Sequence, residues 1–378
     1  MKRLGIFSYY DKDGVVDTYI EYILDNLICV VDDLIIAVNG KINVEGQVKF
    51  GKYTKHIIIR NNKGFDAGAY ADIIINIIGK EELKRWDEIV LCNDTFYGPF
   101  KSFKDIFKSM NFSECDFWGL NYVENNILNH IQSYFLVFRN KIIQNGDLFE
   151  YFFSEINSEE EEISNVYAIF EVGLFNRMVS LGYKFDVYSN TKNYSIYDSA
   201  DICIIKYGLP IWKKKTFHPD YLNLEQQIFI FQHIMYKTKY ELNHILSSIK
   251  RQYGIYIKEN KIIKYKNYIS FENRKKEPVS CVTEKDIIKF LNNNKKIYIY
   301  GTGIIARKIW NIYCKHIDTF NGFIVSKREN DNCNLYGFPI KIYSEIPEEV
   351  AILVALNPQN TESIKYNLKN GDNVFFLW

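Results

Sequence analysis

The stretch EIVLCNDTFYGPF, residues 88–100, contains the pattern that decides the predicted fold. It begins with a short apolar run, IVLC, which is typical of a strand buried on both faces of a sheet. The run ends in a polar triplet, Asn93, Asp94 and Thr95. Open α/β sheets bind their ligands at the carboxyl ends of strands. The triplet is therefore the first candidate for a ligand site.

Strand-like and helix-like segments alternate around this run. Apolar runs predict strands at 3–10, 33–39, 55–60, 88–92, 116–120 and 131–138. Apolar residues at helical spacing predict helices at 15–27, 69–79, 102–110, 147–156, 166–181 and 225–250. Strands that alternate with helices form mainly parallel sheets covered on both faces. The predicted fold class is α/β.

A second α/β domain is predicted toward the carboxyl end. Residues 253–269 alternate around a Glu259-Asn260 turn and suggest a hairpin, and the charged, Pro-containing segment 270–280 suggests a linker. A new series follows, with helix 284–293, strand 295–301, a helix, and strands 320–326 and 350–357. We therefore predict two domains, 1–272 and 281–378.

Composition limits the classes of function. The formal net charge of +1 argues against nucleic acid as a partner, because phosphate backbones select strongly basic surfaces. Seven scattered cysteines without metal-ligand spacing predict thiols in a reducing cytoplasm. No apolar run approaches the ~20 residues of a membrane-spanning helix. Aromatic residues, at 16%, suit either a carbohydrate-binding surface or an aromatic core.

Asp94 is the candidate metal ligand. A carboxylate at a strand end can hold Mg²⁺ together with substrate phosphates. The alternative is a polar turn in which Asn93 and Asp94 bond nearby backbone amides.

The segment RNNKGFDAGAY, residues 60–70, is the second candidate. Gly64 and Gly68 permit positive φ or a close backbone approach, so Asp66 could accept hydrogen bonds from a ribose or a base. The alternative is that Asp66 caps the helix that begins near Ala67.

Glu171 is the candidate general base. It shares a helical stripe with Leu174 and Met178, and a carboxylate on an inward face must be paired or open to a pocket. A pocket carboxylate can take a proton from a hydroxyl nucleophile. The alternative is a structural salt bridge with Arg177 or Arg139.

His130, Gln132 and Ser133 stand at the start of an apolar strand, where their side chains could line the edge of a cleft. A single histidine in such a place is more often structural than catalytic.

These motifs together resemble one family. The segments YYDKDG, NNKGFDAGAY, CNDTFYGPF, DFWGL, HIQSYFLVF and FEVGLFNRMVSLGYKFDVY, followed by LPIWKKKTF and KYELNHILSSIKR, resemble the rhamnan synthesis protein F family of polysaccharide-building glycosyltransferases. The resemblance covers roughly residues 1–250. It implies a GT-A-like fold, in which a Rossmann-like nucleotide half is joined to an acceptor half.

The resemblance assigns roles to the candidate residues. Asn93-Asp94-Thr95 stands where such enzymes carry Asp-x-Asp, so a single carboxylate would hold the donor diphosphate, with or without Mg²⁺ or Mn²⁺. Asn62, Gly64 and Asp66 fall in a nucleotide-binding segment. Further residues matched to the site by the resemblance or by position are Asp11, His130, Gln132 and Glu171, with Glu171 where the catalytic base stands.

The expected activity is inverting transfer of a sugar from a dTDP- or UDP-sugar to a hydroxyl of a bacterial surface polysaccharide. The acceptor would be a lipid-linked glycan or an oligosaccharide, which implies peripheral contact with the inner membrane face. Lys213 to Lys215 could offset diphosphate charge, although a solvated basic turn is the preferred interpretation. His218 could contact a metal or the diphosphate.

The carboxyl-terminal domain carries Gly301-x-Gly303-x-x-Ala306 between a strand and a helix, which is the context of a dinucleotide fingerprint. The next strand ends in Ser326-Lys327, without the acidic residue that NAD sites use. NAD is therefore not expected, and a packing or partner module is favoured. Two rival functions stay open: a non-catalytic nucleotide-sugar-binding or assembly subunit, and an NAD-dependent sugar-modifying enzyme.

Overall fold

The structure is a computed structural model that describes residues 1–218, 221–257, 262, 280, 282–327, 334–365, 368 and 371–378. It divides into two compact units. Unit 1 contains Met1–Val123, His130–Glu161 and Leu174–Glu277, and unit 2 contains Glu124–Asn129, Glu162–Gly173 and Pro278–Trp378. Most of the predicted hairpin at 253–269, from residue 258 on except 262, and all of the predicted linker at 270–280 except residue 280 lie outside the described residues. The domain boundaries 1–272 and 281–378 stay predictions.

Unit 1 is built on a seven-stranded sheet in the order β10-β6-β9-β4-β1-β2-β3. Strands β1 to β4 are mutually parallel, and β9 runs antiparallel to both β4 and β6. A parallel Rossmann-like half is thus joined to a mixed half, which confirms the predicted α/β, GT-A-like fold class. The strands are β1 (Arg3–Tyr9), β2 (Asp33–Asn39), β3 (His56–Arg60), β4 (Glu88–Asn93), β6 (Phe117–Gly119), β9 (Phe135–Arg139) and β10 (Phe185–Val187).

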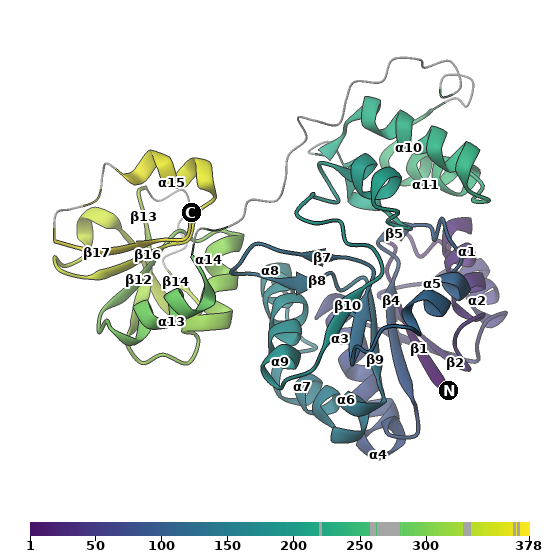
Figure 1. Ribbon diagram of the computed structural model, residues 1–378, viewed down its shortest axis with the longest axis horizontal. Helices are drawn as coiled ribbons and strands as arrows, with labels where there is room; N and C mark the ends of the chain where they lie inside the picture. Colours follow the sequence, from purple (N-terminus) through teal and green to yellow (C-terminus); the bar gives the residue numbers. More distant parts are fainter. Residues whose placement is uncertain are drawn as a thin grey trace. The chain divides into compact units, whose positions relative to one another are not determined.

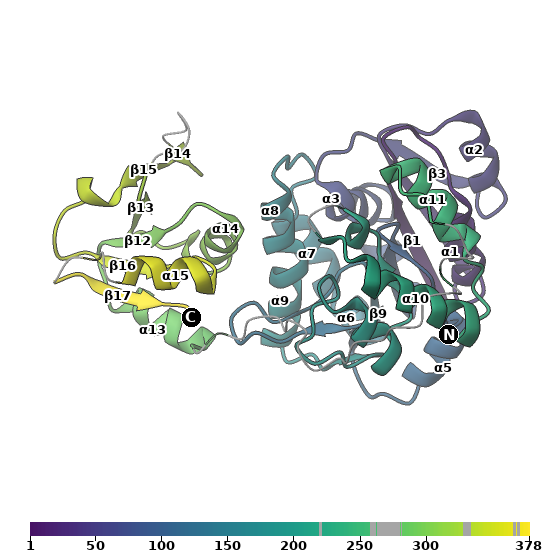
Figure 2. The same ribbon diagram turned by 90° about the horizontal axis from the view of Figure 1, so that it is seen from above.

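Helices cover this sheet, and two of them lie beyond the end of the sheet near the short strand β5 (Phe96–Tyr97), which is not part of it (Figures 1 and 2). These two are α10 (Leu224–Lys237) and α11 (Asn243–Tyr253), and α11 packs on α1 (Thr18–Leu27). The N-terminus marks the opposite end of the strands in Figure 1. The other helical elements are α2 (Val44–Gly51), α3 (Phe65–Ala71), η1 (Asp72–Ile78), α4 (Lys80–Leu83), α5 (Phe103–Met110), α6 (Asn140–Asn145), α7 (Asp147–Glu155), α9 (Leu174–Ser180), η3 (Ile202–Lys206) and η4 (Lys214–Phe217).

The structure departs from the predicted elements in two places. The single strand expected at 131–138 is two strands, β8 (His130–Ile131) and β9, because β8 leaves the main sheet to pair with β7 (Tyr122–Val123). The single helix expected at 225–250 is two helices, since α10 ends at Lys237 and α11 begins at Asn243. Apolar spacing alone does not show such breaks.

Unit 2 is a smaller doubly wound domain. Its sheet has the order β14-β15-β13-β12-β16-β17, and β12, β13, β15, β16 and β17 are parallel. Alternate side chains of β12 and β16 enter two separate cores, one over α13 and α14 and the other on the α15 side. The elements are α8 (Ile163–Val166), η2 (Tyr167–Gly173), α13 (Glu284–Asn292), β12 (Ile297–Tyr300), α14 (Ile304–Ile309), η7 (Trp310–Cys314), β13 (Phe320–Val325), β14 (Asn334–Leu335), β15 (Phe338–Ile342), η8 (Tyr343–Glu345), β16 (Ala351–Val354), α15 (Pro358–Ile364) and β17 (Asn373–Phe376).

Among the described residues, the helices are too short or too polar to cross a lipid bilayer.

Candidate functional site

The polar triplet continues directly from β4, at the carboxyl end of the parallel strands. Asn93 Oδ1 accepts hydrogen bonds from the N–H (3.1 Å) and the Oγ–H (2.7 Å) of Thr95. Asn93 Nδ2 donates to Asp66 Oδ2 at 2.8 Å, which joins the triplet to the loop after β3. The polar turn that was the alternative interpretation is therefore present, since the Asn93 side chain accepts from the backbone N–H of Thr95. The same side chain also contacts Asp66, a second predicted site residue.

Two lysines from a distant part of the chain reach the triplet. Strand β5 (Phe96–Tyr97) pairs antiparallel with β11 (Trp212–Lys213), and the Lys214 N–H donates to Thr95 O at 3.0 Å. Lys213 Nζ then lies 2.5 Å from Thr95 Oγ1. Lys214 Nζ lies 3.3 Å from Asp94 Oδ2 and 2.6 Å from the hydroxyl of Tyr19.

These contacts correct the preferred interpretation of the lysine run. A solvated basic turn was expected, but Lys213 is 8% exposed, and Lys214 is 13% exposed at its side chain. Only Lys215 is exposed, where its ammonium lies over the rings of Tyr197 and Tyr221. The solvated interpretation fails because pairing of β11 with β5 draws the first two lysines inward.

Burial controls the charges of the Asp94–Lys214 pair. Burial raises the pKa of the Asp94 carboxyl above its usual range, and Lys214 only partly opposes this shift. For Lys214, burial would lower the pKa, but the charge of Asp94 outweighs it and the pKa lies above its ordinary value. Tyr19 is buried beside them, and burial followed by the charge of Asp94 raises its pKa. The charge of the buried Asp94 carboxylate is thus stabilised by the ammonium group of Lys214.

The loop after β3 positions Asp66. Gly64 adopts φ +66°, and a Cβ there would lie 2.8 Å from Ser158 O. Arg60, which the sequence analysis did not single out, donates to Lys63 O at 2.8 Å and to Ser158 O at 3.2 Å, so it fixes the loop on both sides. Asp66 Oδ1 accepts from the N–H of Ala67 at 3.0 Å.

Asp66 does not cap α3, because the helix already begins at Phe65 and its N-cap is Gly64, without a side-chain cap bond. The carboxylate of Asp66 instead lies in the first turn of the helix and contacts the triplet through Asn93. Asn62 is half-buried in the same loop, between β3 and α3.

Asp11 anchors a second charged cluster, just after β1. Its Oδ2 lies 2.5 Å from Arg251 Nη2, and its Oδ1 accepts from the N–H groups of Asp13 (2.9 Å) and Val15 (3.1 Å). Arg251 also bonds Asp17 Oδ2 at 2.8 Å. Arg251 ends the quoted segment KYELNHILSSIKR, but the sequence analysis gave neither it nor Asp17 a role, and the packing of α11 on α1 brings them together.

Tyr9, the last residue of β1, has a buried hydroxyl. Among the described residues no hydrogen-bond partner is found for it, and the side chain is 1% exposed. Burial raises the pKa of Tyr9, and the nearby charges of Asp11 and Asp94 raise it further. The Tyr9 hydroxyl therefore lies within electrostatic reach of both carboxylates.

His130 and Gln132 lie on or beside β8 and are buried. Gln132 Oε1 accepts from Asn121 Nδ2 at 2.7 Å, and Asn121 Oδ1 accepts from the hydroxyl of Tyr134 at 2.5 Å. The Tyr134 ring faces Lys213 Nζ at 4.6 Å, so Gln132 supports the lysine through two intervening residues. His218 is exposed at the end of η4, and the two residues after it lie outside the described part of the chain.

Glu171 lies in a different unit from the other predicted site residues. It is 9% exposed on η2, which belongs to unit 2, whereas Asp11, Asp66 and Asp94 belong to unit 1. The proposed partner Arg139 is engaged elsewhere, since its Nε lies 3.2 Å from Glu88 Oε1. Asp11, Asp66 and Asp94 thus belong to one unit, and the role of Glu171 stays a prediction.

The donor set at Asp94 is poor for a divalent cation. The described residues contain no group of three or more His, Cys, Asp or Glu side chains arranged to hold a metal ion. The Asp94 carboxylate is paired with an ammonium group, and the side-chain oxygens of Asn93 and Thr95 already accept hydrogen bonds.

Unit 2 presents its glycine loop after β12, as the sequence predicts. Gly301 adopts φ +116°, and a Cβ there would lie 2.9 Å from Leu356 Cδ2 and 3.1 Å from Ala355 O. Ser326, just beyond the neighbouring β13, lies 2.7 Å from the hydroxyl of Tyr300. This tight loop fits close packing between strands and helix.

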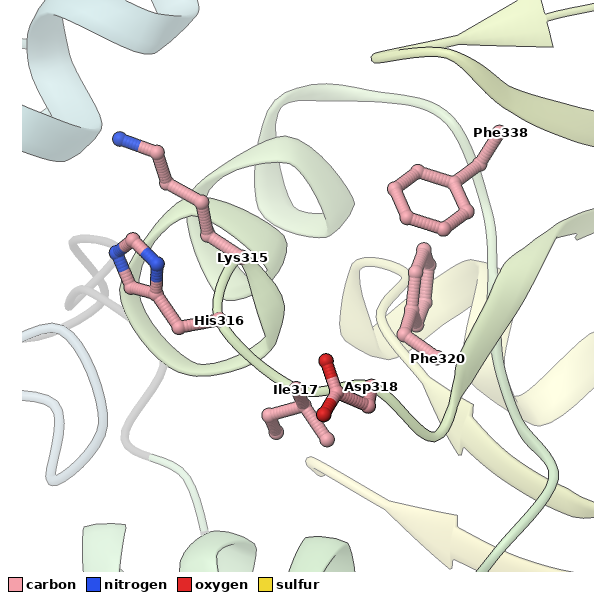
Figure 3. Close-up of a pocket in the computed structure, with 6 residues that line it drawn as sticks. All are labelled: Lys315, His316, Ile317, Asp318, Phe320 and Phe338. Carbon is pink, nitrogen blue, oxygen red and sulfur yellow. The ribbon is translucent and has the colours of Figure 1, made fainter.

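A pocket of about 530 Å³ lies elsewhere in unit 2. Phe320 and Phe338 lie together on one side of it, and Lys315 and His316 lie on the other (Figure 3). Both phenylalanines begin their strands, so the pocket is at the opposite end of the sheet from the glycine loop. It does not correspond to a dinucleotide site.

Comparison with known protein families shows which family the chain belongs to. Residues 34–282 match rhamnan synthesis protein F. The chain belongs to this family. Together with the fold and the charged site, membership of the rhamnan synthesis protein F family supports a transferase that uses nucleotide sugars.

A curated relative of this family member is the virulence protein VirA of Vibrio anguillarum (strain ATCC 68554 / 775). It is 27% identical over 180 residues, which are 46% of this chain and 55% of VirA. The chain thus spans about half the length of the curated relatives it matches.

Two solved structures show a distant likeness to the chain. The galactosyltransferase LgtC, in complex with donor and acceptor sugar analogs, is 9% identical with a TM-score of 0.32, and the match covers 64% of this chain and 98% of LgtC. A nucleotide-diphospho-sugar transferase from Desulfovibrio desulfuricans G20 is 13% identical with a TM-score of 0.29, covering 62% and 96%. Because these scores are low, the fold class rests on the sheet topology of this family member itself.

Proposed function

We propose that this protein is an inverting glycosyltransferase. It would transfer a sugar from a nucleoside diphosphate sugar, with dTDP or UDP as the nucleotide, to a hydroxyl of a growing bacterial surface polysaccharide. The observation that carries the proposal is the pair of buried ammonium groups, Lys213 and Lys214, on the triplet at the carboxyl end of β4. Positive charge buried at that edge of a parallel sheet suits an anionic ligand such as a diphosphate.

The donor-binding residues would divide the sugar nucleotide between them. The triplet and its lysines would hold the diphosphate, and Asp66, on the loop with Asn62 and Gly64, would orient the nucleoside. Asp11 lies at the end of the neighbouring strand and would border the same ligand. The hydrogen bond between Asn93 and Asp66 supports this division, because it holds the residues proposed for the diphosphate next to those proposed for the nucleoside.

The chemical step would be a single displacement at the anomeric carbon. The acceptor hydroxyl oxygen forms the new C–O bond as the bond from that carbon to the diphosphate oxygen breaks, and the diphosphate leaves with the electron pair. Glu171 would take the hydroxyl proton as general base. Attack from the face opposite the leaving group inverts the anomeric configuration. The role of Glu171 rests on the likeness of EVGLFNRMVSLGYKF to the motif that carries the base in related enzymes.

The acceptor and the sugar are proposed from the family alone. Rhamnose is the sugar that the family description suggests, and a lipid-linked glycan or an oligosaccharide is the proposed acceptor. A lipid-linked acceptor would require contact with the inner face of the membrane from the cytoplasmic side.

The test is a screen of sugar nucleotides for hydrolysis and transfer, with and without EDTA. The proposal expects release of nucleoside diphosphate from one dTDP- or UDP-sugar, with faster release when a polysaccharide acceptor is added. Nuclear magnetic resonance of the product gives the anomeric configuration. Retention of the anomeric configuration would contradict the inverting mechanism. No turnover of any sugar nucleotide would contradict the proposal that the protein is an enzyme.

One observation favours a second function, a non-catalytic nucleotide-sugar-binding or assembly subunit. The only carboxylate of the triplet, Asp94, is engaged by Lys214. Nucleotide binding without turnover by the unaltered chain, over the full set of acceptors, would establish this function instead.

A further inference from the structure

We propose that Lys213 and Lys214 neutralise the diphosphate of the bound nucleotide in place of a divalent cation, so that nucleotide binding requires no metal. This inference rests on the proposed function, because it concerns the same diphosphate. It goes further in naming the groups that supply positive charge when that diphosphate binds and when it departs.

The first argument comes from the surroundings of Asp94. Asp94 is 6% exposed, and its Oδ2 lies 3.3 Å from Lys214 Nζ. Mg²⁺ requires oxygen ligands in near-ideal octahedral geometry, commonly one or two carboxylates with substrate phosphates. A divalent ion at Asp94 would approach a buried ammonium of like charge, with no second carboxylate in the triplet to offset the repulsion. The site therefore disfavours a cation where Lys214 already supplies one.

The second argument comes from the neutral members of the triplet. Asn93 Oδ1 accepts two hydrogen bonds from Thr95, and Thr95 Oγ1 accepts one from Lys213. Asn93 Nδ2 is engaged with Asp66. A metal bound by these oxygens would have to break a closed hydrogen-bond network whose members are largely buried.

The third argument comes from the lysines themselves. An ammonium group has three donors, and the described contacts of Lys214 use two of them, on Tyr19 and Asp94. Backbone pairing of β11 with β5 fixes both stems, and the Lys213 ammonium lies over the Tyr134 ring at 4.6 Å. Lys213 contacts Thr95 and Lys214 contacts Asp94, so both ammonium groups are held at the triplet. An anion bound beside them would accept charge-assisted hydrogen bonds, which are stronger than neutral ones.

A fourth observation is a buried polar group on the neighbouring strand β1. The Tyr9 hydroxyl is 1% exposed and has no partner among the described residues, although buried hydroxyl groups are normally hydrogen-bonded. An acceptor oxygen of a bound nucleotide would satisfy it.

The experiment is isothermal titration calorimetry of UDP and dTDP with the full chain, in EDTA and in Mg²⁺ or Mn²⁺. The inference expects the same dissociation constant, within about twofold, in all conditions. K213M and K214M should each weaken binding about tenfold or more, as expected for loss of a charged hydrogen bond. K215M is the matched control, because Lys215 is exposed and its ammonium lies over the rings of Tyr197 and Tyr221. The K215M variant should bind UDP and dTDP as tightly as the unaltered chain does.

K214M leaves Asp94 buried without its partner and could fail to fold. The double variant D94N/K214M removes both charges, so nucleotide binding can be measured even if K214M does not fold. The comparison of binding in EDTA and in Mg²⁺ uses the unaltered chain and needs no variant. Binding that disappears in EDTA and returns with Mg²⁺ would overturn the inference while leaving the proposed function intact. Lysine variants that bind as tightly as the unaltered chain would also overturn it. If neither nucleotide binds in any condition, the proposed function fails and the inference fails with it.

Discussion

Arg251 on α11 holds Asp11 at the end of β1, with 2.5 Å between Nη2 and Oδ2 across 240 positions of the chain. Burial would raise the pKa of the Asp11 carboxyl, but the bonds from Arg251 and from the N–H groups of Val15 and Asp13 outweigh it and lower the pKa. The fold therefore favours the ionised form. The resulting stability is present above the ordinary Asp pKa of about 3.9 and is lost as the pH falls through the lower folded value.

This lowered pKa predicts the behaviour of Asp11→Asn. At pH 7 the free energy of unfolding should fall by roughly 1.5–3 kcal/mol, the contribution of a hydrogen bond to a charged group. The difference from the unaltered chain should narrow as the pH falls below about 4. Urea unfolding at a series of pH values measures both effects. Asp13→Asn is the control, because Asp13 is half exposed and lies 3.7 Å from Arg251, and it should change little. A loss of equal size at pH 3 and pH 7 would contradict the assignment.

Lys214→Met should destabilise the fold strongly. Removal of one partner leaves the buried Asp94 carboxylate unpaired, which costs roughly 3–5 kcal/mol. The double variant Asp94→Asn/Lys214→Met should recover most of that loss, because no buried charge remains. Equilibrium unfolding of the two single variants and the double variant gives the coupling energy. If the double variant is no more stable than Lys214→Met, the pair does not control local stability.

Gly64→Ala should destabilise the fold. The residue has φ +66°, and a Cβ would lie 2.8 Å from Ser158 O, a backbone atom that cannot easily move. We expect a loss of about 1–2 kcal/mol from the left-handed conformation, with more from the contact. Gly51→Ala is the matched control, since a Cβ there meets nothing within 4 Å, and it should be neutral or slightly stabilising. Thermal unfolding compares the two, and equal melting temperatures would show that the loop relaxes freely.

Removal of the hydroxyl group should have different effects on stability at two tyrosines beside the site. Tyr9→Phe removes a hydroxyl without a partner among the described residues, so the free energy of unfolding should be unchanged or slightly higher. Tyr19→Phe removes the hydroxyl that lies 2.6 Å from Lys214 Nζ, and it should cost about 0.5–3 kcal/mol. Urea unfolding measures both. A destabilised Tyr9→Phe variant would mean that its hydroxyl is already bonded in the folded protein.

Glu171→Gln tests the proposed base separately from donor binding. Turnover should fall by about 10²–10⁴-fold, the usual contribution of general base catalysis, while the dissociation constant for UDP or dTDP stays the same. Glu348→Gln, an exposed glutamate of the same unit, is the control and should keep full turnover. Undiminished turnover in Glu171→Gln would assign the proton transfer to another group.

Local pattern predicted much of the α/β fold. The apolar runs at 3–10, 33–39, 55–60 and 88–92 became β1 to β4, because a strand buried on both faces needs a continuous apolar sequence. Short elements such as β5, β10 and β11 were missed. Two or three residues carry too little periodicity to be recognised.

The candidate site was predicted only in part. The sequence singles out Asn93, Asp94 and Asp66 because polar residues and glycines at strand ends stand out against apolar runs, and the structure bonds Asn93 to Asp66. Lys213 and Lys214 were visible as a charged run, but the run itself does not show which lysines are buried.

The sequence by itself determined the strands, the helices and the polar residues that end them, since these depend on periodicity over a few neighbouring positions. Only the tertiary structure decided which charges meet. The pairing of β5 with β11 brings Lys213 and Lys214 to the triplet, and the packing of α11 on α1 brings Arg251 to Asp11. Partners separated by more than a hundred positions are chosen by the packing of whole elements, which no short stretch of sequence contains.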